Sequence, residues 1–316
     1  MARSAKLLLT GASGLVGSNV ATAAARRGFE VIAIVGGYAG EIPGAARVER
    51  VDVADTSAVQ RLALEIFPDA IVNAAAISEV HQCEADPARS EAINVALPAM
   101  LAQVSHHLGA RLIHLSSEQV FDGLHAPYRA TDAVSPPNRY ARQKVESEQD
   151  VARFAPETAA TVRLPLLGGN SLTGRRSLHE RLFMLWAAGK RARLYRNEIR
   201  QPCSAENVAE MIVELCERRD ARACGLFHWA GAEPVSRAEM GRRVAAHFGL
   251  PAAELIEEAS QLDDVRPGGQ RRQPSLAMDC APLAGLLKTR QERFDEMLER
   301  LAVPPECRAW YHGTVS

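Results

Sequence analysis

The sequence has no excess of either charge, no paired-cysteine motif and no long apolar run. With 37 Lys and Arg against 38 Asp and Glu, its formal net charge is −1, so no overall basic field favours nucleic acid or an anionic membrane. The 6 cysteines form no CxxC pair, and no His/Cys cluster has zinc-ligand spacing. No uninterrupted apolar stretch is long enough to span a membrane, and the first residues lack a signal-peptide layout. We therefore expect a cytoplasmic protein that binds no metal, membrane or nucleic acid.

The first half of the chain alternates short apolar runs with helical patterns. A buried strand is expected at Leu7–Leu9, followed by a helix over Leu15–Arg27. Further strands are expected at residues 31–35, 48–53, 70–73, 111–115 and 161–164, with helices at 56–66, 89–107 and 138–154, and with a bend near Pro98. This alternation predicts βαβ units and therefore an α/β fold: a Rossmann-type, doubly wound parallel sheet.

The second half predicts a smaller C-terminal lobe that binds the substrate. We place a dinucleotide-binding domain at residues 1–165 and the substrate lobe at residues 166–316, with 204–230 returning to the Rossmann sheet. The expected helices cover residues 178–188, 206–218, 237–248 and 289–301, and the returning strand covers 226–229. Trp186 and Trp229 lie in apolar runs and are expected in the core.

A glycine-rich turn follows the first strand, with Gly11, Gly14 and Gly17 spaced three residues apart. Glycine at these positions permits a tight turn, close approach of backbone N–H groups to a pyrophosphate, and close packing of helix on sheet. The helix N-terminus that follows favours negative charge. A strand before the glycines and a helix after them are the context that this fingerprint requires. The turn therefore predicts a bound dinucleotide.

The end of the second strand bears on which dinucleotide is bound. An acidic residue that binds the ribose 2′-hydroxyl is usual there, but the chain has Val35-Gly36-Gly37-Tyr38. No carboxylate is present to repel a 2′-phosphate, and no arginine follows immediately to bind one. We expect NADP(H) or NAD(H), with a slight preference for NADP(H).

A tyrosine and a lysine, Tyr140 and Lys144, are expected on one face of a helix, four residues apart. An ammonium beside a phenol favours the phenolate, so Lys144 is expected to lower the pKa of Tyr140 and make it an acid–base catalyst. Ser117 follows a predicted strand, where a hydroxyl points into the ligand crevice of an α/β sheet. The predicted catalytic residues are Ser117, Tyr140 and Lys144.

The chain resembles the extended short-chain dehydrogenase/reductase family. It has that family's motifs in the same order and spacing: the three glycines, Ser117, Tyr140 and Lys144, together with Asp52 and Asn73-Ala-Ala-Ala76. The resemblance implies that Ser117 and Tyr140 hold the substrate oxygen, that Lys144 also binds the nicotinamide ribose, and that Asn94 supports the active-site helix. The cofactor-binding residues that it implies are Gly11, Ser13, Gly14, Leu15, Val16, Gly17, Asp52, Val53, Asn73, Ala74, Ala75, Ala76, Asn94, Tyr140 and Lys144.

Three segments resemble the dTDP-4-dehydrorhamnose reductase branch of that family: residues 116–123 (SSEQVFDG), Pro127-Tyr128 and residues 136–144. The branch typically reads Ser-Thr-Asp-Tyr-Val-Phe-Asp-Gly, so Glu118-Gln119 replaces its Asp-Tyr. Dehydratases of the wider family carry Asp-Glu at this point, and the absence of that pair argues against elimination chemistry. The expected substrate-binding residues are Glu118, Val120, Arg200 and Arg272, although arginines of this half, taken singly, are more typical of solvated surface.

The resemblance implies an NAD(P)H-dependent reductase that acts on the keto group of a nucleotide-linked sugar, with Tyr140 as the proton donor. Two alternatives stay open. One is a non-catalytic, dinucleotide-binding subunit like the regulatory subunit of methionine adenosyltransferase, and the other is a sugar-nucleotide epimerase that recycles tightly held NAD. The expected partner is a nucleotide-sugar substrate, and the expected assembly is a homodimer.

Overall fold

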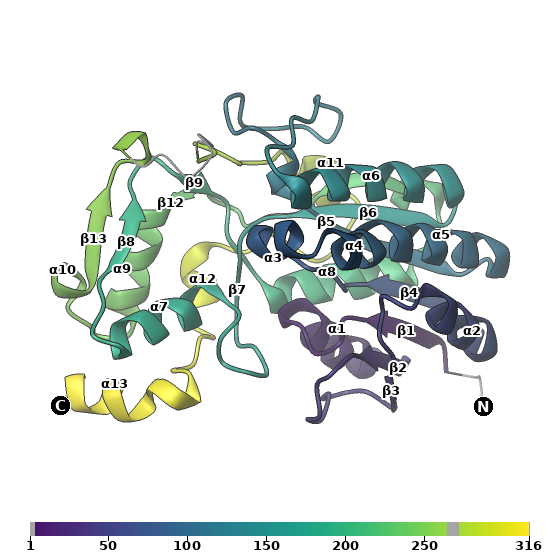
Figure 1. Cartoon of the computed structure of the whole chain (residues 1–316), viewed down its shortest axis with the longest axis horizontal. Coiled ribbons are helices and arrows are strands. Elements are labelled where there is room, and N and C mark those ends of the chain that lie inside the picture. The colour runs from purple at the N-terminus through teal and green to yellow at the C-terminus, as the bar shows by residue number, and fades with distance from the viewer. Residues whose placement is uncertain (1–3, 264–271, 316) are drawn as a thin grey trace.

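The computed structural model describes residues 4–263 and 272–315, and it contains the predicted doubly wound parallel sheet (Figure 1). Seven parallel strands have the order β11-β6-β5-β4-β1-β2-β3. Their bounds are β1 Lys6–Thr10, β2 Glu30–Val35, β3 Arg47–Arg50, β4 Ala70–Asn73, β5 Arg111–Ser117, β6 Ala159–Leu164 and β11 Gly225–His228. The order reverses at β1, so the carboxyl ends of β1 and β4 border the crevice in which such sheets bind ligands.

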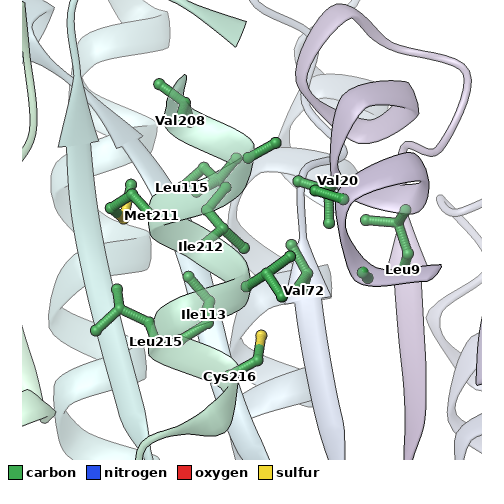
Figure 2. Close-up of a cluster of buried hydrophobic side chains, with 14 of the residues drawn as sticks. Leu9, Val20, Val72, Ile113, Leu115, Val208, Met211, Ile212, Leu215 and Cys216 are labelled. Carbon is green, nitrogen blue, oxygen red and sulfur yellow. The ribbon is translucent and has the colours of Figure 1, made fainter. Parts of the chain in front are cut away.

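Helices cover both faces of the sheet. One face carries α1 (Leu15–Arg26) and α8 (Ala205–Glu217), and the other carries α2 (Thr56–Ile66), α5 (Leu97–Leu108) and α6 (Arg139–Phe154). Side chains alternate along β1, so Leu7 and Leu9 pack toward α1 and α8, whereas Leu8 packs toward the opposite helices. Figure 2 shows the first of these cores, in which one stripe of α8 lies over the strands: Val208, Met211, Ile212 and Leu215.

The segment that the sequence predicted as one bent helix consists of three parts. A short helix, α4 (Pro87–Glu91), is followed by a π-helical stretch at Ala92–Ala96 and then by α5. Pro98 has no N–H and so cannot donate to the carbonyl of Asn94, which removes one regular helical bond at this stretch. A further short helix, α3 (Val80–Ala85), precedes α4.

The smaller lobe lies beside the carboxyl edge of the sheet and has a core of its own (Figure 1). Two-stranded pairs form between β7 and β10, β9 and β12, and β8 and β13. The bounds of its elements are β7 Leu167–Gly168, α7 Leu178–Ala187, β8 Ala192–Tyr195, β9 Ile199–Arg200, β10 Cys203–Ser204, β12 Val235–Ser236, α9 Arg237–His247, α10 Ala252–Leu255, β13 Ile256–Ala259, α12 Phe294–Leu298 and α13 Arg308–Val315. Helix α11 (Ala281–Ala284) packs instead against the core of the sheet, beside β11. Trp186 is buried in this core and Trp229 in the core of the sheet, as predicted.

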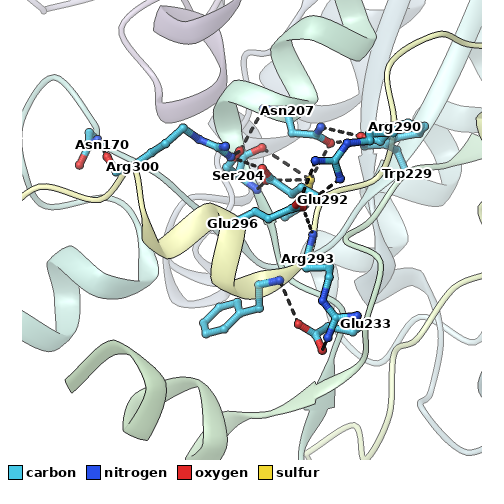
Figure 3. A network of polar contacts seen from close by, with 12 residues as sticks. Asn170, Ser204, Asn207, Trp229, Glu233, Arg290, Glu292, Arg293, Glu296 and Arg300 are labelled. Atoms are coloured by element: carbon cyan, nitrogen blue, oxygen red, sulfur yellow. Dashed lines mark hydrogen bonds and ion pairs between the residues drawn. The ribbon is translucent and has the colours of Figure 1, made fainter. Parts of the chain in front are cut away.

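The predicted helix over residues 289–301 is wrong for its first half. Only α12 is helical, because tertiary hydrogen bonds hold the preceding residues in an extended path. The N–H groups of Lys288 and Thr289 donate to the two carboxylate oxygens of Glu214 at 2.6 and 2.9 Å. Figure 3 shows further polar contacts that hold this extended segment. In it, Glu292 accepts a hydrogen bond from the Ser204 N–H and forms an ion pair with Arg300.

Residues 272–279, which we call the C-terminal strap, bridge the two parts of the molecule. On the Rossmann side, the Tyr128 N–H donates to Ala277 and the Asp279 N–H donates to Tyr128, at 2.9 and 2.7 Å. On the lobe side, the Ile199 N–H donates to Pro274 at 2.7 Å. The strap therefore fixes the lobe against the sheet edge. Among the described residues, we find no helix with the length and apolarity needed to cross a membrane.

Candidate active site

A cavity of about 1160 Å³ lies between the carboxyl edge of the sheet and the smaller lobe. Most of the predicted site residues line it, from the glycine turn at one side to the catalytic residues and the lobe arginines at the other. These residues are Gly11, Ser13, Gly14, Leu15, Val16, Val53, Ala74, Ala75, Ala76, Ser117, Glu118, Tyr140, Lys144, Arg200 and Arg272. The fold thus brings together, around one cavity, residues that are more than 250 positions apart in the sequence.

The glycine turn leaves no room for side chains. Gly11 has φ of +67°, and a Cβ there would lie 2.6 Å from the backbone of Ala74. A Cβ on Gly17 would lie 2.2 Å from the carbonyl oxygen of Gly11. Helix α1 begins at Leu15 without a side-chain cap, so its first N–H groups face the cavity with no acceptor of their own. We call the turn from Gly11 to Gly17, with the first N–H groups of α1, the glycine cradle. The glycine cradle fits the pyrophosphate of a dinucleotide.

Because of this packing, Gly17→Ala is expected to displace the turn and weaken NADPH binding by about tenfold to a hundredfold, the cost of overpacking a rigid backbone contact. Titration of NADPH by fluorescence would measure the change. Gly313→Ala is the matched control, since a Cβ at Gly313 meets no atom within 4 Å. Unchanged NADPH affinity in Gly17→Ala would contradict the assignment of this cradle.

Ser117 and Tyr140 meet at the cavity wall. Ser117 ends β5 and caps the short 3₁₀ turn Glu118–Val120, accepting from the Gln119 N–H at 3.2 Å. Helix α6 begins at Arg139, where Asn138 accepts from the Ala141 N–H at 2.9 Å, and this cap places Tyr140 in the first turn. The Ser117 side chain lies near enough to the Tyr140 hydroxyl to act on its pKa, which it lowers. The predicted pair is therefore preassembled.

Lys144 lies one turn further along α6, with only 2% of its surface exposed, and its Nζ donates to the carbonyl of Leu115 at 2.7 Å. Burial lowers the pKa of Lys144 to about 8 and raises the pKa of Tyr140 to about 12. The expected net lowering of the Tyr140 pKa is thus wrong for this structure, because removal of the phenol from water is the largest effect and raises the pKa. Tyr140 keeps its proton at neutral pH, which is the form that a proton donor requires.

Five predicted residues do not line the cavity. Gly17 and Asn73 lie behind its wall, where Asn73 accepts from Thr10 at 2.6 Å. Asn94 joins the loop after β4 to the active-site helix: it accepts from the Ile77 N–H at 3.0 Å and donates to Gln143 at 2.9 Å. This contact is consistent with the predicted support of α6.

The structure corrects the expectations for Val120 and Arg200. Val120 is fully buried with Phe121, Tyr128 and Leu276, so it does not contact a ligand in the cavity. Arg200, which taken singly was expected at the surface, is only 8% exposed. Asp52 also lies outside the cavity wall, and its carboxylate is held by Arg89 at 2.9 and 3.0 Å, which lowers its pKa.

Several cavity residues were missed by the sequence analysis. The lobe contributes Glu198 and Arg237, and burial lowers the pKa of Arg237. Within the described ranges, no acidic side chain forms a direct ion pair with Arg237, although the charges of Glu198 and Glu118 lie near enough to raise its pKa against the effect of burial. No sequence pattern marks these residues, because lobe packing alone brings them to the site. In the same ranges, no group of three or more His, Cys, Asp or Glu residues is arranged to hold a metal ion.

Known proteins resemble the chain over nearly its whole length. The methionine adenosyltransferase 2 subunit beta of Xenopus tropicalis is 31% identical over 281 residues, covering 88% of this chain and 81% of that protein. A probable low-salt glycan biosynthesis reductase of Haloferax volcanii is also 31% identical, covering 93% and 96%. The crystal structure of a hypothetical dTDP-4-dehydrorhamnose reductase from Sulfolobus tokodaii superimposes with a TM-score of 0.76 at 26% identity, covering 92% and 98%.

The family model described as RmlD substrate binding domain matches residues 5–303. This match spans the glycine turn, the Ser117 and Tyr140 pair and the lobe that closes the cavity. It confirms the resemblance to the dTDP-4-dehydrorhamnose reductase branch. The chain belongs to the RmlD substrate binding domain family, within the extended short-chain dehydrogenases/reductases.

Proposed function

We propose that this protein is an NAD(P)H-dependent reductase that acts on the keto group of a nucleotide-linked sugar. The observation that carries the proposal is the neighbouring Ser117 and Tyr140 pair, which shares one cavity with Lys144 and the glycine cradle. A reductase relative of 31% identity supports the same reaction class.

In this reaction the bound cofactor would supply a hydride to the carbonyl carbon. Ser117 donates a hydrogen bond to the carbonyl oxygen and orients it. Tyr140 transfers its proton to that oxygen as negative charge develops there. Lys144, held against the Leu115 carbonyl, places a positive charge below the phenol and stabilises the phenolate that remains.

The charges of the cavity wall support an anionic substrate. Among the described residues, no carboxylate forms a direct ion pair with Arg237, while Arg200 and Arg272 share the carboxylate of Glu198 at 3.2 and 3.4 Å. Guanidinium groups bind phosphate oxygens through paired N–H donors. We infer that Arg237 and Arg272 hold the diphosphate of a nucleotide sugar, while Arg200 is engaged by Glu118, Glu198 and two backbone carbonyls.

We favour NADPH over NADH as the reductant. The carboxyl end of β2 carries no acidic residue, and Arg50 lies opposite Val35 on the neighbouring strand, with its Nη2 3.5 Å from the Ala39 carbonyl. A guanidinium at this edge is suited to a ribose 2′-phosphate. Sequence reasoning overlooked Arg50 because it reaches the edge from an adjacent strand.

The test is a turnover screen of NADPH and NADH against keto sugars linked to dTDP, UDP and GDP, followed by the absorbance of the reduced nicotinamide. We expect consumption of NADPH at a lower KM than NADH, with one hydroxyl formed per hydride transferred. NAD that stays bound through purification and drives interconversion of two sugar nucleotides would instead support an epimerase.

A second candidate function rests on the similarity to a methionine adenosyltransferase subunit, which extends over 81% of that protein. If this chain serves as a subunit of such an enzyme, it will form a stable complex with the catalytic chain in size-exclusion chromatography. Formation of that complex, together with no turnover of any keto sugar nucleotide, would overturn the reductase proposal.

A further inference from the structure

His114 is a buried histidine on β5 that no step of the proposed reaction uses. It lies three residues before Ser117, and only 1% of its surface is exposed. Within the part of the chain that the structure describes, it belongs to no group of three or more possible metal ligands. Its ring nitrogens contact two other elements, since Nδ1 lies 3.2 Å from Nδ2 of Asn73 and Nε2 lies 3.0 Å from Oγ of Ser147. The ring therefore links β4 to α6 across β5.

The hydrogen bonds through His114 run in one direction. The Ser147 hydroxyl donates to the backbone carbonyl of Lys144 at 2.8 Å, and a carbonyl only accepts. Oγ of Ser147 then accepts from a proton on Nε2 of His114. Nδ1 carries no proton and accepts from Asn73, whose own side-chain oxygen accepts from Thr10 at 2.6 Å. These contacts require a neutral imidazole with its proton on Nε2.

A neutral ring also suits the charge of Lys144. Burial lowers the pKa of His114 well below its usual value, and the positive charge of Lys144 lowers it further. Burial also lowers the pKa of Lys144, while Glu148 and Cys83 act in the opposite direction. A second positive charge beside the ammonium would oppose its protonated form. His114 thus donates a hydrogen bond next to Lys144 without adding charge there.

Lys144 is held at both of its ends by consecutive residues of β5. Its Nζ donates to the carbonyl of Leu115 at 2.7 Å, and its backbone carbonyl is connected to His114 through Ser147. A lysine side chain is a flexible stem, so a contact at Nζ alone is compatible with several conformations. The second connection fixes the turn of α6 that carries Lys144 against β5, and so limits where the ammonium lies relative to Tyr140.

We propose that His114 is a positioning residue, which acts through Ser147 to hold Lys144 in place beside Tyr140. For its effect on turnover the inference rests on the proposed function, in which Lys144 stabilises the phenolate of Tyr140. The environment of Lys144 is measured without turnover, so the two hypotheses are tested separately.

Two substitutions of His114 each keep one of its two contacts. In His114→Gln, the amide nitrogen is as many bonds from Cα as Nε2 of the ring, so it can donate to Ser147. In His114→Asn, the amide oxygen is as many bonds from Cα as Nδ1, so it can accept from Asn73 but leaves Ser147 without a donor. Ser147→Ala removes the hydroxyl itself. Its matched control is Ser105→Ala, which removes a buried hydroxyl of α5 that is bonded to Thr158 at 3.0 Å.

The environment of Lys144 is measured by NMR of the full chain with ¹³C-labelled lysine, in which each Cε signal reports the pKa of its amine. The sequence has only four lysines, so the signal of Lys144 is easily assigned. From about 8 in the unmodified protein, the pKa of Lys144 should rise by about 0.5 or more in His114→Asn and Ser147→Ala, because an ammonium that is held less closely regains water. It should stay unchanged in His114→Gln and Ser105→Ala.

Turnover is the second measurement, on the keto sugar nucleotide that the protein reduces best. We expect kcat to fall by about tenfold in His114→Asn and Ser147→Ala, because misplacing a group at the reacting centre slows the chemical step. In His114→Gln, kcat should stay within about threefold of the unmodified protein. The KM for the substrate should change little in all of these variants, since none of the exchanged side chains lines the cavity. A single cooperative thermal transition verifies that each variant is folded.

The same pKa of Lys144 in His114→Gln and His114→Asn would overturn the proposal, and so would an unchanged pKa in Ser147→Ala. Ser147→Ala removes only one hydroxyl, so it decides the question if either substitution of the ring prevents folding. A protein that reduces no keto sugar, but shows the expected differences in the pKa of Lys144, would refute the reductase and retain the role of His114. A protein that turns over, with one pKa of Lys144 common to all variants, would do the reverse.

Discussion

Replacing Tyr140 with phenylalanine is expected to lower kcat by about a thousandfold, within the range for loss of a positioned proton donor. The phenol lies beside Ser117 and stays protonated at neutral pH, so the reaction loses its proton source and one contact to the substrate oxygen. The glycine cradle is untouched, and NADPH affinity should be unchanged. Steady-state turnover on the best substrate of the panel, with NADPH titration in parallel, measures both quantities.

Tyr128→Phe is the matched control for this variant. Tyr128 is also buried, but its hydroxyl donates to Asp122 at 2.7 Å and lies outside the cavity. It should lose some stability and keep its turnover. Full activity in Tyr140→Phe would refute Tyr140 as the proton donor, and equal losses in both variants would point to a general structural effect.

Replacing Glu148 with glutamine is expected to destabilise the fold by about 3–5 kcal/mol, the usual cost of leaving a buried ion without its partner. Glu148 contacts Arg163 at 2.8 and 2.6 Å and accepts from Ser116 at 2.5 Å, with all three side chains buried. Removing the charge leaves the buried guanidinium of Arg163 without its negatively charged partner. For a chain of this size, Tm should fall by roughly 5–8 °C in differential scanning calorimetry.

Glu146→Gln, on the exposed side of the same helix, controls for the loss of one negative charge from α6 and should leave Tm within about 1–2 °C. Glu148 also lies one turn after Lys144 and counteracts the lowering of its pKa. Glu148→Gln should therefore lose the protonated form of Lys144 at a lower pH. An unchanged Tm in Glu148→Gln would show that the ion pair contributes little.

The parts of the fold that could be predicted are those in which a local pattern determines a local structure. The apolar run of β1, the glycines after it and the spacing of Val208, Met211 and Ile212 on α8 each indicate their element without tertiary information. The parallel arrangement of the strands then follows from the alternation of strand and helix, whereas their order in the sheet comes from the structure. The same local logic placed Tyr140 and Lys144 one turn apart on α6.

Features that depend on packing between distant segments could not be predicted. The i, i+4 spacing of Tyr140 and Lys144 gives no measure of burial, and burial reverses the expected shift in the tyrosine pKa. Arg237 becomes a cavity residue only when the lobe packs against the sheet. The extended path before α12 depends on Glu214, some 74 residues earlier, and no periodicity in residues 289–293 indicates it.

The position of the C-terminal strap late in the sequence determines when the two sides of the cavity can form during protein synthesis. Strands β1 to β6 and helix α6 precede residue 165, so the nucleotide cradle and the catalytic pair can form early in synthesis. Arg272 and the contacts of residues 274–279 are made more than a hundred residues later. A nascent chain halted before residue 272 would hold the cradle yet leave the substrate side of the cavity open.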